Sequence, residues 1–184
     1  TVPAFQCQTD STDCLAKARQ NLATYHKEAT QHQKAWQKQE KAIAALLQYG
    51  HFRYLANLDA PPYGRMISER FRATYRFVDG EKEAAMQSVC TDAALGLHFI
   101  NIAHSQILDG IIGASMIGRD VPLLAEMLAE SPAGIRLPAA CDEVKVQPAE
   151  NLSLCPRMYG EWRGMSERLQ NALQEEELKK NDEK

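Results

Sequence analysis

The chain has 184 residues, of which 45% are hydrophobic and 24% are charged. These proportions are typical of an ordinary globular domain and exclude a chain too polar to fold. The formal net charge is only −3, and acidic residues stand near each basic cluster, such as Lys179 and Lys180. This charge pattern excludes the basic surface of a nucleic-acid-binding protein, so we expect no nucleic-acid partner.

The chain starts Thr1-Val2-Pro3, without a methionine. We interpret this start as the result of processing or of an omitted segment, such as a signal peptide or a membrane anchor. The most apolar stretch, 93–118, has too many polar residues for a membrane span, namely His98, Asn101, His104, Gln106 and Asp109. Membrane contact is therefore expected only through an anchor or lipid that precedes Thr1.

A long helix is predicted from about residue 12 to residue 49, with Gly50 ending it. Residues along one side recur at spacings of three and four, which is the pattern of a heptad seam with two polar interruptions. They are Leu15, Ala18, Leu22, Tyr25, Ala29, His32, Trp36, Gln39, Ile43 and Leu46. Because the stretch 24–41 is rich in Gln, Lys and His, we expect the middle of this helix to be more exposed than its ends.

The C-terminal segment is the predicted partner of this seam. Its apolar residues repeat at spacings of four and three, which favours a helix lying antiparallel against the long one. These residues are Met158, Trp162, Met165, Leu169 and Leu173. After Leu178 the chain has no apolar residue, so a disordered tail is predicted over 179–184. Residues 1–178 are predicted to form a single all-helical domain.

Shorter elements are predicted between these two helices. In chain order they are a proline-marked loop at 59–64, helices at 66–77, 81–118 and 121–130, and an irregular segment at 132–156. Asp120 is the predicted cap of the 121–130 helix. Small residues at 110, 113, 114 and 118 predict close packing against another helix. No strand pattern is long enough to build a sheet. The predicted fold class is therefore all-α, a helical bundle whose long N-terminal helix packs against the C-terminal helix, with a compact helical body stapled by two disulfides.

The five cysteines indicate where the protein works. Cys7 and Cys14 bracket a short polar segment, and Cys141 and Cys155 bracket an irregular one. The simplest pairing is Cys7–Cys14 and Cys141–Cys155, with Cys90 as a buried thiol inside a helix. Pairing Cys7 with Cys155 and Cys14 with Cys141 serves as well if the two chain ends lie together. Disulfides indicate an oxidising compartment, so we expect a periplasmic or secreted protein; five reduced cysteines would instead indicate the cytosol.

Polar residues of the predicted 81–118 helix share an arc of about 80°, at about 100° per residue. They are Thr91, His98, Asn101, Ser105 and Asp109. One interpretation is a polar cleft in which Asp109 is the strongest charge; the other is a thin solvent face or a buried hydrogen-bond network. His98 and Ser105 are about 10 Å apart along a helix, too far for a base and its nucleophile. No motif predicts a catalytic residue, a cofactor or a metal site.

Two functional hypotheses follow from these patterns. The first is a non-enzymatic protein of the bacterial envelope or periplasm that binds a protein partner. Examples of this role are an inhibitor or immunity protein against a secreted antibacterial toxin, or an accessory subunit of an envelope assembly. The alternative is a hydrolase acting on cell-wall or lipid substrates, with a polar cleft around Asp109. The missing catalytic motifs favour the first hypothesis.

Overall fold

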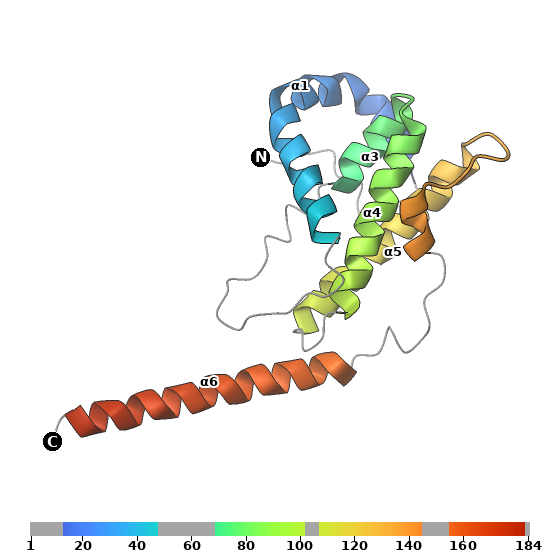
Figure 1. Ribbon diagram of the computed structural model, residues 1–184. Helices are drawn as coiled ribbons and strands as arrows, with labels where there is room; N and C mark the ends of the chain where they lie inside the picture. The colour runs from blue at the N-terminus through green and yellow to red at the C-terminus, as the bar shows by residue number, and fades with distance from the viewer. Residues whose placement is uncertain (1–12, 48–68, 102–106, 145–154, 183–184) are drawn as a thin grey trace.

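The computed structural model describes residues 13–47, 69–101, 107–144 and 155–182, and every regular element within these ranges is a helix. The elements are α1 (Cys14–Leu47), α3 (Glu69–Val78), α4 (Lys82–Asn101), α5 (Ile107–Ala129), the 3-10 helix η1 (Ala139–Glu143) and α6 (Cys155–Asp182). Figure 1 shows α4 at the centre beside α5, with α1 and α3 on one side and α6 extending away. The predicted all-α class is confirmed.

The packing of α4 against α5 is closest at two glycines, Gly96 and Gly113. A Cβ atom added to Gly96 would lie 2.9 Å from the carbonyl oxygen of Gly113. A Cβ on Gly113 would lie still closer to the carbonyl oxygen of Gly96. Since backbone atoms cannot rotate aside as side chains do, only glycine fits at this crossing. The close packing predicted for the small residues is thus found at Gly113.

The helix boundaries in this region differ from the prediction. The predicted helix from Glu81 to about Gly118 is two helices, because α4 ends at Asn101 and α5 begins at Ile107. The predicted new start at Asp120 is also wrong, since α5 continues through Gly118 and contains Pro122. The buried residues of α5 on both sides of this point are Gly113, Met116, Asp120, Leu123 and Met127. We infer that burial of this one face outweighs the local cost of a glycine and a proline.

Two clusters of buried apolar side chains attach α1 to the body. The first joins the beginning of α1 to α3, α4 and α5, and the second joins the end of α1 to α4 and α5. Their buried members are Cys14, Leu15, Ala73, Phe77, Ala85, Met86, Val89, Leu123 and Met127 in the first, and Ile43, Leu95, Phe99 and Met116 in the second. Most side chains described between these ends are exposed, as the composition of the stretch predicted.

α1 bends over the body, although it contains neither glycine nor proline (Figure 1). Tyr25 and Trp36 would lie about 16 Å apart along a straight helix, yet their stacked ring centroids are 5.9 Å apart. Tyr25 also stacks on Tyr75 of α3 at 4.3 Å, and the Arg72 guanidinium lies 5.3 Å from the Trp36 ring centroid. These aromatic and cation–π contacts lie on the inner side of the bend and hold it against α3.

The predicted packing of α1 against the C-terminal helix is wrong. α1 packs mainly against α3, whereas α6 packs mainly against α5. The apolar positions at both ends of the α1 seam, including Leu15, Ala18 and Ile43, are already buried in the body. The predicted partner row on α6 is exposed. α6 also continues to Asp182, into the segment that was predicted to be a disordered tail.

A disulfide joins Cys90 to Cys141 across 51 residues of sequence and ties α4 to η1. The predicted Cys141–Cys155 bond is therefore wrong, as is the alternative Cys14–Cys141 bond. Cys90 is buried as predicted, but it is a disulfide partner and not a core thiol. Closing a loop of this length contributes about 4 kcal/mol in the chain-entropy model.

The two other described cysteines are Cys14 and Cys155. Cys14 is buried at the start of α1 and is disulfide-bonded. Its predicted partner, Cys7, lies outside the described residues, so the Cys7–Cys14 pairing stays a prediction. Cys155 carries an exposed thiol at the start of α6. The pairing of neighbouring cysteines failed for Cys141 because η1 packs on α4, which brings Cys90 beside it.

The glycine crossing predicts a specific effect of one methyl group. Gly113→Ala should lower the free energy of unfolding by about 1–3 kcal/mol, because the methyl meets the α4 backbone. Gly118→Ala is the matched control on the same helix, since an added Cβ there has nothing within 4 Å. It should leave stability unchanged or raise it by up to about 1 kcal/mol. Urea unfolding followed by circular dichroism measures both; equal changes would contradict the crossing.

Candidate functional site

The residues of the predicted polar stripe do not share one helical face, because α4 ends and α5 begins between them. Asn101 is exposed at the last position of α4, and Ser105 lies outside the described residues. His98 is half-buried, with its Nε2 3.7 Å from Oε2 of Glu143. Asp109 lies in the first turn of α5 and is only 2% exposed. A buried Asp109 does not favour an open cleft around this carboxylate.

Sequence reasoning missed a group of buried charged residues between α3, α4 and α5. Arg70 and Arg72 on α3, Asp92 on α4 and Asp120 on α5 are all buried, with Asp92 4% and Asp120 1% exposed. Asp92 and Asp120 share a side-chain hydrogen bond. One oxygen of each carboxyl group has no hydrogen-bond partner among the described residues. A signal was present, because Asp92 interrupts an apolar stretch of α4 and Asp120 follows one on α5.

Burial raises the pKa of both carboxyl groups, since the protein interior disfavours their charged forms. The pKa of Asp92 is raised furthest, first by burial and then by the negative charge of Asp120. Burial raises the pKa of Asp120 to about 7, while the Arg70 guanidinium opposes this rise. The hydrogen bond stabilises the proton on Asp92 and the charge on Asp120. The pair therefore retains a proton in the folded protein under conditions where an exposed aspartic acid has lost it.

A pocket of about 260 Å³ lies under the bend of α1. It is lined by α1 and α3 residues, namely Tyr25, His26, Ala29, Thr30, Gln33, Trp36, Gln37, Glu40, Arg72 and Arg76. Its charged groups already contact one another. Arg76 Nη1 donates to Glu40 Oε1 at 2.9 Å, and Arg72 Nη1 lies 3.7 Å from the same oxygen. Since both arginines face the Glu40 carboxylate, these contacts explain how α1 is held and do not define a ligand.

The most exposed apolar surface lies on α6. We call it the α6 apolar row, defined as Met158, Trp162, Met165, Leu169 and Leu173. These side chains are 54% to 65% exposed. At about 100° per residue they fall within an arc of about 80°. A stripe of five large apolar side chains this exposed is unusual for the surface of a protein without a partner.

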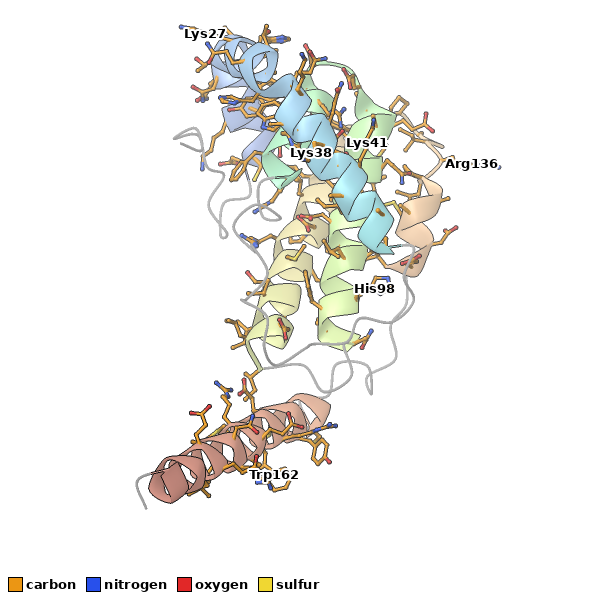
Figure 2. All side chains as sticks on the ribbon, turned by 60° about the vertical axis from the view of Figure 1, so that its left-hand side comes forward. Lys27, Lys38, Lys41, His98, Arg136 and Trp162 are labelled. Carbon is orange, nitrogen blue, oxygen red and sulfur yellow. A yellow bond between two sulfur atoms is a disulfide. The ribbon has the colours of Figure 1, made fainter. Side chains whose placement is uncertain are left out.

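The opposite side of α6 is buried or charged, not apolar and exposed. Gly160 is buried, and Arg163 Nε donates to Glu167 Oε1 at 2.8 Å, on the side away from the apolar row. Glu161, at the edge of the row, accepts a hydrogen bond from the backbone N–H of Ile107 at the start of α5, at 3.0 Å. Figure 2 shows Trp162 on the side of α6 turned away from the body. The helix thus directs its largest apolar side chains away from its own chain.

Comparison of the chain with protein-family models, with curated proteins and with solved structures finds no match. Within the described ranges, no three His, Cys, Asp or Glu side chains are grouped as a metal ion would require. None of the helices described is both long and apolar enough to cross a membrane.

The buried carboxyl pair predicts a pH dependence of stability. A carboxyl whose pKa is raised on folding stabilises the folded protein below the pKa of an unfolded aspartic acid, about 4. This stabilisation is lost as the pH rises through the folded pKa, which is about 7 for Asp120. The free energy of unfolding should therefore fall between pH 5 and pH 8. The fall is at most about 1.4 kcal/mol per pH unit for each of the two carboxyl groups.

Asp92→Asn tests the source of this decline. The amide of the variant can donate to the Asp120 carboxylate without titrating. The free energy of unfolding should therefore fall less between pH 5 and pH 8 than in the parent protein. Glu83→Gln, at an exposed site on the same helix, is the control and should follow the parent protein. Urea unfolding at both pH values measures the effect. The same decline in Asp92→Asn as in the parent protein would rule out the pair as its cause.

Proposed function

We propose that this chain is a non-enzymatic protein that binds another protein through the α6 apolar row. The observation that carries the proposal is the exposure of the row, 54% to 65% for each side chain, on a helix whose opposite side lies toward the body. Removing such side chains from water contributes roughly 1.5–3 kcal/mol each when burial is complete. This is enough to drive association once the cost of ordering the partners is subtracted.

The shape of the row favours a protein over a small molecule as the ligand. The row spans about 22 Å of helix, at about 1.5 Å per residue, and it lies on a convex surface. Apolar side chains at helical spacing are the anchors by which a helix binds a groove or another helix. Tryptophan and methionine, which the row contains, are also enriched where protein surfaces meet.

The proposed compartment follows from the disulfide. The Cys90–Cys141 disulfide supports an oxidising location, so we propose a periplasmic or secreted protein of the bacterial envelope. Within that setting, the proposed roles are an inhibitor or immunity protein against a secreted toxin, or an accessory subunit of an envelope assembly. The burial of Asp109 gives no support to the alternative of a hydrolase with an open cleft at this residue.

Site-specific photo-crosslinking tests the proposal. Benzoylphenylalanine in place of Met165 should give a covalent adduct with a protein on irradiation in the organism that makes the chain. The same residue in place of Arg163, on the opposite side of α6, is the control and should give little adduct. Mass spectrometry of the adduct identifies the partner. No adduct at position 165, or equal adducts at both positions, would contradict binding through the row.

A further inference from the structure

We propose that the α6 apolar row binds the same row of a second copy of this chain, with the two α6 helices antiparallel. This inference rests on the proposed function and names its partner. It is carried by the spacing of the row, by the charges at its edges and by the side of α6 on which it lies.

The spacing of the row is that of a coiled-coil seam. Met158, Trp162, Met165 and Leu169 follow one another at intervals of four, three and four, so they occupy alternating d and a positions. In an antiparallel pair, a positions of one helix lie level with d positions of the other. A register that pairs Trp162 with Met165 of the second copy also pairs Met158 with Leu169. All four residues are therefore matched by a single two-fold axis, as a self-complementary interface requires.

The charges at one edge of the row select this antiparallel arrangement. Glu161 and Arg168 are one heptad apart on the same edge, at the two g positions. In the register above, each Glu161 lies opposite Arg168 of the second copy, so two ion pairs form about the axis. In a parallel pair, g positions face e positions, where Glu161 would meet Ser166 and Arg168 would meet Leu173. Along the apolar row, only the antiparallel pair has opposite charges facing each other.

The other edge of the row is compatible with the same register. There the e positions Tyr159 and Ser166 face each other across the axis, and both side chains carry a hydroxyl group. Tyr159 is 51% exposed, so its ring extends the apolar surface of the row at this edge. No like charges are brought together on either edge.

The apolar row lies on the side of α6 that faces away from the described part of the body. Trp162 is turned away from the body in Figure 2, and the buried Gly160 lies on the opposite side of the helix. Glu161 accepts the Ile107 N–H through Oε1, which leaves its second carboxylate oxygen for the arginine of the second copy. Beyond Leu173 the sequence continues with Glu175, Glu176 and Glu177, which ends the apolar row.

Reciprocal charge exchange tests the register. By sedimentation equilibrium the protein should be a dimer. Glu161→Arg and Arg168→Glu, each alone, should raise the dimer dissociation constant about tenfold, because each places like charges opposite each other twice. An equimolar mixture of the two variants should regain the parent affinity as a heterodimer, in which both facing pairs are again opposite in charge. Arg163→Glu, on the opposite face of α6, is the control and should dimerise as the parent does.

The outcomes separate this inference from the proposed function. A monomer at the highest soluble concentration overturns the second copy as partner. The proposed function still holds in that case if the crosslink at position 165 joins the chain to a different protein. If the protein dimerises but the mixture fails to regain affinity, the antiparallel register is wrong. If neither a dimer nor an adduct is found, both proposals fail.

Discussion

The contact between the backbones of α4 and α5 at Gly96 and Gly113 governs the rest of the body. Because the two helices touch there without intervening side chains, residues on either side of the crossing are brought into one narrow layer. Leu95, Phe99 and Met116 form the apolar cluster beside the crossing, and the end of α1 packs on it. The same closeness brings Asp92 and Asp120 into hydrogen-bonding contact away from water.

The remaining elements are attached to this pair of helices by different means. α1 and α3 pack on it through apolar side chains, and the aromatic contacts of Tyr25 hold the bend of α1 against α3. η1 has only one buried residue, Cys141, so apolar packing holds it weakly. Its disulfide bond to Cys90 attaches it to α4. α6 stands apart, since its described contacts with the body are few compared with the length of apolar surface that it leaves exposed.

Helical spacing alone predicted the class of the fold and the two long helices, because a 3.6-residue period is a local property. It did not predict which helices pack together. The seams of α1 and α6 match in spacing, but the α1 seam is used by the body, and nothing local distinguishes a body partner from the C-terminal helix. The Cys90–Cys141 bond was missed for the same reason, since 51 residues separate its cysteines. The sequence pattern identified the residues of the α6 apolar row, but it did not predict that they are exposed. The Asp92–Asp120 pair depends on a helix crossing that no local pattern describes.

The attachment of α1 at both ends has a consequence for its dynamics. Leu15 and Ile43 are anchored in two separate apolar clusters, while the turns between them touch the body through few side chains. We expect backbone amides near the anchors to exchange slowly, because their exchange requires the body itself to open. Amides in the bent middle can exchange through local opening, with the ends still in place. We therefore expect one continuous helix to contain segments that open independently. The stacking of Tyr25 on Trp36 and on Tyr75 opposes the opening of the middle segment.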